Sequence, residues 1–162
     1  MVLPAKIFEI REDTDLNLIV QKLKDFREEE PYRMEKGEAI NLVAEILDLK
    51  LRDGSIEGVF SRDFVRKRCY RREFDDVLVT EESPFWIKRI EGRTFLIVMG
   101  PSVARGVKKL LTNHVANSLS EVLFIRPGAI VEGRISHETL RKLHESTPQA
   151  TKLIWFDDVD IP

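Results

Sequence analysis

The sequence predicts an α+β fold in which helices pack on an antiparallel sheet of about four or more strands. Apolar and polar residues alternate along much of the segment 40–99, as they do in strands. The dipeptides Asp53-Gly54 and Glu91-Gly92 interrupt this segment as turn signals. Segments with helical spacing of apolar residues lie on either side of it. Strands grouped together, with helices before and after them, are typical of α+β proteins.

The N-terminal region is predicted to hold one strand and one helix. Residues 5–10, AKIFEI, have the composition of a strand. Thr14 can cap a helix that follows, and Pro31 is expected to end this helix after its acidic residues 28–30, before a polar linker to Gly37. The apolar residues at helical spacing are Leu16, Ile19, Val20, Leu23 and Phe26.

The central segment is predicted to form a meander of about four strands. Asp53-Gly54 is typical of a type I′ hairpin turn, because both central residues of that turn need positive φ. This turn sets a register in which apolar residues face apolar residues and charges face opposite charges. The predicted pairs are Leu51 with Ile56, Lys50 with Glu57, Leu47 with Phe60, Glu45 with Arg62 and Val43 with Phe64.

The remaining elements follow from similar signals. Residues 76–79 and 84–90 are predicted strands, and a tight turn at Glu91-Gly92 would place Trp86 opposite Ile97. Ser102 can cap a second helix, with the apolar residues Val103, Val107, Leu110, Leu111 and Val115 on one side. Two further strands, 122–125 and 152–156, are expected to flank a short helix over residues 137–144.

Length and composition favour one small globular domain. A chain of 162 residues, 43% of them hydrophobic, can bury one substantial core. We expect a single domain over residues 1–162, which could be the N-terminal part of a longer chain with an oligomerisation segment. The single Cys69 excludes an internal disulfide framework and fits a reducing compartment. No zinc site and no cofactor are expected, since Cys69 stands in no ligand spacing.

The apolar runs are short. The longest, such as residues 95–99, cannot span a bilayer, so we expect a soluble, cytoplasmic protein without membrane partners. The net charge of −2 hides a local excess of positive charge, because residues 61–74 hold six cations and two anions. Local positive charge of this kind is typical of a surface that binds a polyanion.

The candidate binding segment is the stretch 64–74, FVRKRCYRREF. Single-stranded nucleic acid needs cations for its phosphates and flat groups that stack on exposed bases. Side chains alternate along a strand, so basic and aromatic residues would share one face. The residues predicted to bind nucleic acid are Arg66, Arg68, Tyr70, Arg71 and Arg72, with a second set, Lys88 and Arg89, beside Phe85 and Trp86 on the strand 84–90.

Structural roles compete with this interpretation. The predicted register places Phe60 and Phe64 on the core face, and Trp86 can also be a core residue. Lysines and arginines protect strand edges from aggregation, so the basic residues could be a solvated edge. Lys88 and Arg89 point to opposite faces, so one of the two at most can join a shared groove.

Two other functions stay open. Asp157, Asp158 and Asp160 near the end of the sequence, or Asp75 and Asp76, could hold Mg²⁺ for phosphodiester hydrolysis, although they match no nuclease spacing. The basic strand could instead contact acidic protein surfaces, as in a protein-interaction module. No histidine stands in a pattern that nominates a general base.

The arrangement resembles the archaeal thermophile single-stranded-DNA-binding family called ThermoDBP, and in particular its ThermoDBP-related members. The likeness consists of a leading helix, a meander carrying RDFVRKRCYRR and PFWIKR, following helices, and a composition rich in charged residues. It is architectural and covers most of the chain. The resemblance implies a non-enzymatic, non-OB-fold protein that binds single strands by basic and apolar contacts and forms homo-oligomers.

Overall fold

The computed structural model of the chain describes residues 5–100, 108–123, 129–133 and 135–150. The chain divides into two compact units, residues 1–132 and 133–162. Compact units need not be separate folding domains. The expected single domain over residues 1–162 therefore stays a prediction.

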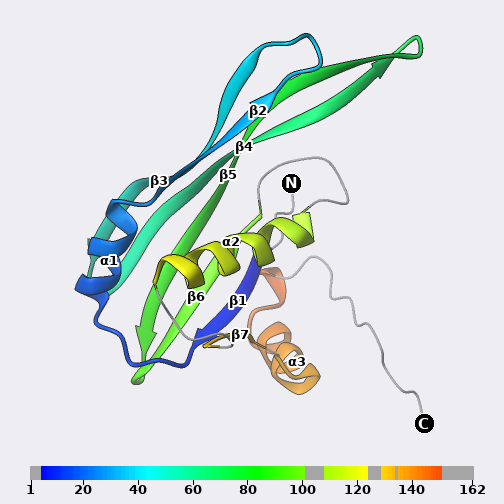
Figure 1. Ribbon diagram of the computed structural model, residues 1–162. Helices are drawn as coiled ribbons and strands as arrows, with labels where there is room; N and C mark the ends of the chain where they lie inside the picture. Colours follow the sequence, from blue (N-terminus) through cyan, green and yellow to red (C-terminus); the bar gives the residue numbers. More distant parts are fainter. Residues whose placement is uncertain (1–4, 101–107, 124–128, 134, 151–162) are drawn as a thin grey trace. The chain divides into compact units, whose positions relative to one another are not determined.

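The first unit is built on an antiparallel sheet, which confirms the predicted α+β class (Figure 1). The order of its seven described strands is β2-β3-β4-β5-β6-β1-β7. The strands β3, β4, β5 and β6 pair in sequence order and are the predicted meander. Their bounds are β1 (Ala5–Ile10), β2 (Arg27–Arg33), β3 (Ala39–Arg52), β4 (Ser55–Tyr70), β5 (Glu73–Ile90), β6 (Arg93–Met99) and β7 (Ile130–Glu132).

Two helices of this unit, α1 (Leu16–Lys24) and α2 (Lys108–Val122), pack on one face of the sheet. The core lies between them and that face, because alternate residues of each strand point toward the helices. The largest fully buried side chains are Ile19, Leu23, Ile56, Phe85, Ile87, Leu96, Val98, Val115 and Leu119. The second unit holds α3 (His137–Ser146), which confirms the predicted helix 137–144, and the 3₁₀ helix η1 (Pro148–Ala150).

The predicted end of the first helix is wrong. Helix α1 ends at Lys24, and residues 27–33 form β2 at the edge of the sheet. An edge strand tolerates both a run of carboxylates and Pro31, because one side of its backbone needs no partner strand. Asp15, rather than Thr14, caps the helix and accepts a hydrogen bond from the Asn17 amide at 3.2 Å.

The predicted hairpin register holds near its turn and fails beyond it. The pairs Leu51 with Ile56 and Lys50 with Glu57 are confirmed. A β-bulge then adds one residue to β3 between Leu47 and Lys50, where Asp48 has a φ of 53°. Three predicted pairs are therefore wrong by one residue: Leu47 faces Val59 instead of Phe60, Glu45 faces Ser61 instead of Arg62, and Val43 does not face Phe64.

Strand β5 is longer than predicted. It runs unbroken from Glu73 to Ile90 and joins the two predicted strands 76–79 and 84–90 through Pro84. The predicted pairing of Trp86 with Ile97 is confirmed. Val122 belongs to α2, so the predicted strand 122–125 is wrong at its start. Leu123 lies in the turn after α2, whereas Ser102, residues 124–125 and the predicted strand 152–156 lie outside the described residues.

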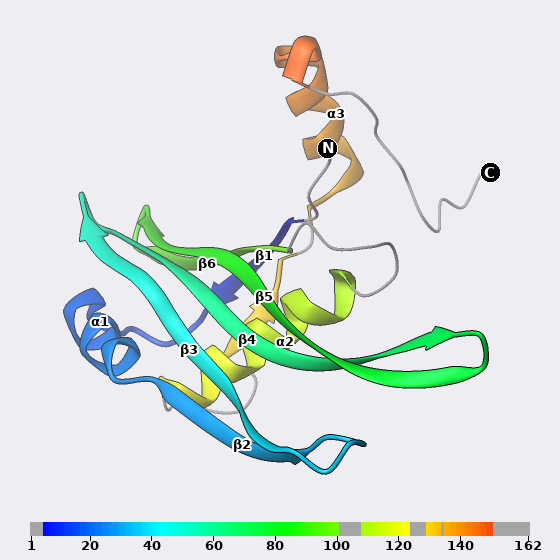
Figure 2. The same cartoon turned by 90° about the horizontal axis from the view of Figure 1, so that it is seen from above.

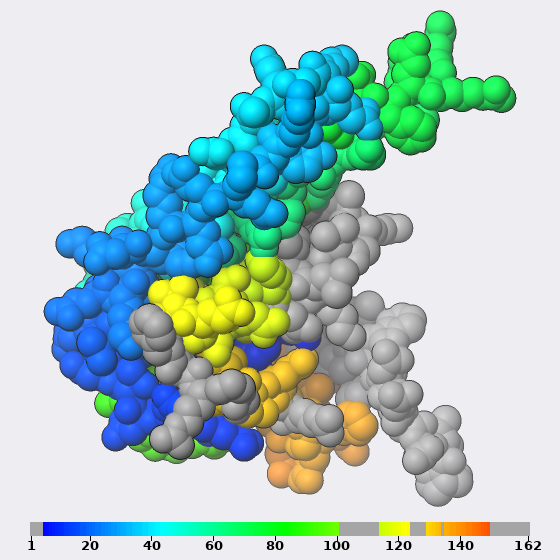
Figure 3. All heavy atoms as spheres, viewed as in Figure 1, coloured from blue at the N-terminus to red at the C-terminus, as the bar shows by residue number. Residues whose placement is uncertain are grey.

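Strands β4 and β5 continue past their neighbours as a two-stranded arm. Pairing of β3 with β4 ends at Arg62, whereas β4 pairs with β5 as far as Tyr70 opposite Glu73. We call residues 63–80 the arm and residues 68–74 its tip. Figures 1 and 2 show the arm leaving the sheet, and its end stands clear in the space-filling view (Figure 3).

Candidate nucleic-acid interface

The arm has two faces that continue the two faces of the sheet. Residues directly opposite each other in an antiparallel pair share a face. Arg66, Arg68 and Tyr70 therefore lie on the face that continues from buried Phe60, which we call the helix-side face. The other face of the arm carries the cross-strand pairs Val65 with Leu78, Lys67 with Asp76 and Cys69 with Phe74.

The cations in the lower half of the arm are paired with carboxylates. Arg66 donates to Glu81, which is 5% exposed. Lys67 contacts Glu35, in the loop between β2 and β3, at 2.5 Å, and this hydrogen bond raises the pKa of Lys67. These carboxylates offset the two positive charges, so neither cation is fully available to a phosphate.

The same loop braces the arm from the side. Lys36 contacts Asp75 at 2.8 Å, and its hydrogen bond lowers the pKa of Asp75. The backbone amide of Glu35 donates to Asp76 at 3.0 Å. This loop thus contacts Lys67, Asp75 and Asp76 of the arm, and Arg68, the first residue of the tip, lines a hollow beside the loop.

The tip combines cations with exposed rings. Among the residues that the structure describes, Arg68, Arg71 and Arg72 have no ion-pair partner. Tyr70 is 65% exposed and Phe74 is 58% exposed. The guanidinium carbon of Arg71 lies 5.4 Å from the centre of the Tyr70 ring, within the range of a cation–π contact. These residue types suit phosphate contact and base stacking.

The turn at the tip is conformationally unusual. Arg71 and Arg72 join β4 to β5 with φ values of 50° and 68°. A type I′ turn requires positive φ at both positions and favours Asn-Gly there. The turns at Asp53-Gly54 and Glu91-Gly92 have glycine at their second position, and this turn has none. Left-handed conformations cost residues with a side chain roughly 1–2 kcal/mol each. The backbone conformation of this turn therefore disfavours arginine at both positions.

The second predicted set does not join the tip. Lys88 pairs with Ser55 at the other end of the β4–β5 hairpin, fifteen residues along β4 from Tyr70. At about 3.3 Å per residue this is up to roughly 50 Å along an extended strand. Arg89 contacts Asp13 at 3.2 Å and the Thr14 carbonyl oxygen at 2.9 Å. The structure therefore brings Arg68, Tyr70, Arg71 and Arg72 together, with Arg66 below them, and separates Lys88 and Arg89 from them.

The aromatic residues divide between core and surface. Phe60 is buried as expected, whereas Phe64 is half-buried and has the guanidinium carbon of Arg62 5.2 Å from its ring centre. Trp86 is half-buried on the face of the sheet opposite the helices. Sequence reasoning did not select Phe74 or Glu81. The two-residue turn at 71–72 would have placed Phe74 opposite Cys69, but Glu81 lies too far along β5 for any local pattern to reveal its partner.

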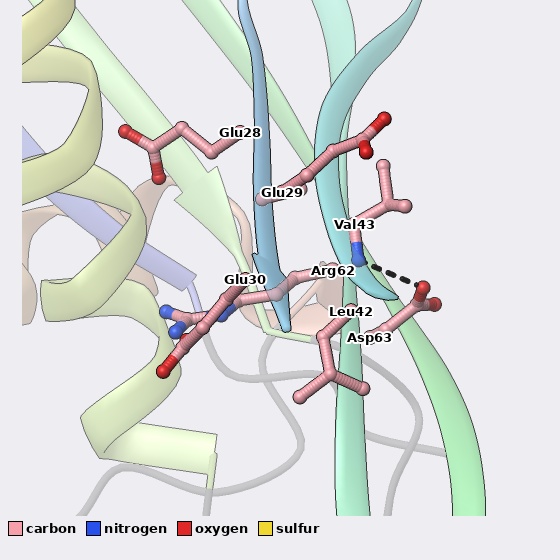
Figure 4. Close-up of a pocket in the computed structure, with 8 residues that line it drawn as sticks. Glu28, Glu29, Glu30, Leu42, Val43, Arg62 and Asp63 are labelled. Atoms are coloured by element: carbon pink, nitrogen blue, oxygen red, sulfur yellow. Dashed lines mark hydrogen bonds between the residues drawn. The ribbon is translucent and has the colours of Figure 1, made fainter. Parts of the chain in front are cut away.

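A cavity of about 430 Å³ lies beside the root of the arm, lined by β2, β3 and β4 (Figure 4). Three glutamates of β2 and Asp63 give it an acidic lining that repels phosphates. Asp63 accepts hydrogen bonds from the Val43 amide at 3.0 Å and from Thr80 at 2.7 Å. Arg62, which also lines the cavity, donates to His114 of α2. This cavity is therefore not a suitable site for nucleic acid.

The aspartates of the nuclease hypothesis do not form a described cluster. Asp75 and Asp76 are used by Lys36 and the Glu35 amide. Asp157, Asp158 and Asp160 lie outside the described residues. Within the described part of the chain, no group of three or more His, Cys, Asp or Glu residues could hold a metal ion. None of the described helices is both long and apolar enough to cross a membrane.

Comparisons with known proteins identify no relative. No family model, no curated protein and no solved structure matches the chain. The resemblance to the ThermoDBP family, with the archaeal and thermophile origin and the homo-oligomer that it implies, therefore stays a prediction.

Proposed function

We propose that the protein binds single-stranded nucleic acid, DNA or RNA, without catalysing a reaction on it. The binding surface is the tip of the arm, where Arg68, Arg71 and Arg72 contact phosphates and Tyr70 stacks on a base. Arg66 lies below this surface and links the arm to the sheet through its ion pair with Glu81. Recognition at the tip tolerates sequence, because phosphates are common to all strands and every base has a face on which a ring can stack.

The distribution of paired and unpaired cations supports this proposal. The lower cations of the arm form ion pairs with carboxylates, whereas Arg71 and Arg72 in the turn have no carboxylate partner among the described residues. Arg68 lies opposite Asp75 across the hairpin but forms no ion pair with it. Edge protection, the competing interpretation, explains charges along an exposed strand. It does not explain two arginines in turn positions that favour Asn and Gly. A requirement for positive charge at the turn of the tip explains both the unpaired cations and the presence of arginine at the two turn positions.

Titration by fluorescence anisotropy tests the proposal. Labelled single-stranded DNA, single-stranded RNA and duplex DNA are compared at two salt concentrations with divalent metal chelated. We expect salt-sensitive binding that favours single strands, since neutralised phosphates release counterions. Absence of binding to all three nucleic acids would overturn the proposal and favour a protein partner for the basic surface.

A pair of charge-reversal variants assigns the site. Arg71→Glu with Arg72→Glu should weaken binding at least tenfold and leave the fold intact, because both side chains are exposed. The matched control is Lys24→Glu with Arg52→Glu, which changes the net charge equally at exposed positions outside the arm. Equal loss in both variants would mean that net charge, rather than the tip, controls binding.

A further inference from the structure

Two exposed rings lie on opposite faces of the tip. Tyr70 pairs with Glu73 and belongs to the helix-side face, whereas Phe74 pairs with Cys69 and belongs to the other face. Their positions along the arm differ by one residue, and each ring is more than half exposed. Solvent exposure of one aromatic ring is common at a surface. A ring on each side of the same turn is a more specific arrangement.

This arrangement limits how one nucleic-acid strand can bind. A strand that runs along one face of the arm can stack a base on Tyr70 or on Phe74, but the backbones of β4 and β5 separate it from the other ring. Both rings can be used at once when bases lie on both sides of the arm. The two rings lie on opposite faces, so the thickness of the arm from face to face sets the distance between the two nucleic-acid strands. Sheets pack about 10 Å apart face to face, which gives the arm a thickness that two diverging strands can accommodate.

We propose that the preferred ligand of the tip is a fork, the junction at which a duplex divides into two single strands. This inference rests on the proposed function. The arm stands between the diverging strands, with a base of one strand stacked on Tyr70 and a base of the other stacked on Phe74. Arg71 and Arg72 at the apex face the last base pair of the duplex and contact phosphates of both strands.

The exposed apolar groups of the arm suit the open end of a duplex at a fork. The last base pair of a duplex has no stacking neighbour on its open side, so it unpairs more easily than an internal pair. Apolar wedges inserted by proteins stabilise such openings. Leu78, which is also exposed on the face of Phe74, extends the apolar surface on that side. A protein that binds both separated strands also shifts the equilibrium toward strand separation by mass action.

The test compares a fork with its parts. A fork with two non-complementary tails, a single strand and a blunt duplex are prepared in DNA and in RNA and titrated by anisotropy without divalent metal. A 2-aminopurine at the first pair of the fork reports whether that pair opens. We expect the fork to bind about tenfold more tightly than the single strand and the 2-aminopurine fluorescence to rise on binding.

Variants connect the preference to the two rings. Tyr70→Ala and Phe74→Ala should each reduce the preference for the fork, and the double variant should bind the fork and the single strand equally. Ile90→Ala is the matched control, since it removes an exposed apolar side chain at the opposite end of β5 and should leave the preference unchanged. Thermal unfolding of each variant checks that the truncated side chains did not affect the fold.

The outcomes separate this inference from the function on which it rests. Equal affinity of the wild type for the fork and the single strand would overturn the fork preference and leave the proposed function standing. Persistence of the preference in the double variant would overturn the role of the two rings. Absence of binding to every probe would overturn both proposals.

Discussion

Arg66 and Glu81 form an ion pair that ties the arm to the sheet. Arg66 belongs to the arm, and Glu81 lies on β5 opposite Arg62, where pairing of β3 with β4 ends. Glu81 is almost fully buried, and its second carboxylate oxygen has no hydrogen-bond partner among the described residues. The carboxylate therefore depends on Arg66 for compensation of its charge.

Replacement of Arg66 by alanine should destabilise the protein. Loss of the partner leaves a buried carboxylate uncompensated, and because Arg66 is partly exposed we expect a loss of about 1–3 kcal/mol in the free energy of unfolding. Urea denaturation at pH 7 measures this loss in the free energy of unfolding. Arg68→Ala is the matched control, with an expected change within about 0.5 kcal/mol. Equal stability of the two variants would show that Glu81 has another source of compensation.

Gly58 should not tolerate a side chain. A Cβ atom at this position of β4 would lie 2.7 Å from the Cζ atom of Phe85, which is fully buried in the core. The ring would have to move within a close-packed interior, so Gly58→Ala should destabilise the protein by about 1–3 kcal/mol. Denaturation compared with Glu57→Ala, at an exposed neighbouring position, measures the effect. An unchanged midpoint would mean that the core around Phe85 adapts freely.

The fold could be predicted where local signals decide the structure. Asp53-Gly54 set the hairpin correctly, because two turn residues determine the first pairs of a hairpin. The register beyond Asp48 could not be predicted, since a bulge at a polar strand residue leaves no distinct pattern in one sequence. Strand β2 was mistaken for a helix end and a linker because charges and proline mark both features.

The candidate site was predictable in composition but not in detail. Its basic and aromatic residues stand together in the sequence, so their position on one strand could be inferred. The strand was expected to continue through Arg72, but it ends at Tyr70, and Arg71 and Arg72 form the turn. Two carboxylates decide which cations of the arm are paired. Glu35 contacts Lys67 from 32 positions away in the chain, and buried Glu81 contacts Arg66. Such distant contacts cannot be obtained from alternation along a strand. Phe74 was missed because it lies on the opposite face of the arm.

Stability should fall in mildly acidic solution through His114. Burial, and then the positive charge of Arg62, lower the pKa of His114 in the folded protein, against smaller opposite effects of Glu28 and Glu121. The unfolded chain therefore binds the proton more readily. The free energy of unfolding should decrease as the pH falls below about 6.5, the ordinary value for histidine, and level off below the folded pKa.

Urea denaturation at pH 7.5 and pH 5.5 checks this pH dependence. The decrease between the two values should be smaller in His114→Gln, because glutamine keeps a hydrogen-bond acceptor for Arg62 but does not titrate in this range. Comparison within each variant removes any constant effect of the substitution on stability. The same decrease in wild type and variant would assign the pH dependence to other groups.

Replacement of Arg71-Arg72 by Asn-Gly should separate stability from binding. Asn and Gly suit the left-handed positions of this turn, so the free energy of unfolding should rise by about 1–2 kcal/mol. Loss of two phosphate contacts should lower the slope of log affinity against log salt by about 1.4, from roughly 0.7 per contact on a single strand. Urea denaturation and anisotropy at several salt concentrations measure both quantities on the same preparation.

Glu91→Asn provides the comparison, since it changes the first position of the turn at the opposite end of β5, where Glu91 has a φ of 49° and is followed by Gly92. It should stabilise that turn slightly and leave binding unchanged. A tip variant that is more stable but binds weakly would mean that the arginines are kept at a conformational cost for the ligand. A tip variant that is more stable and binds with the wild-type affinity and slope would remove Arg71 and Arg72 from the binding surface, and binding would then have to rest on Arg68 and the two rings.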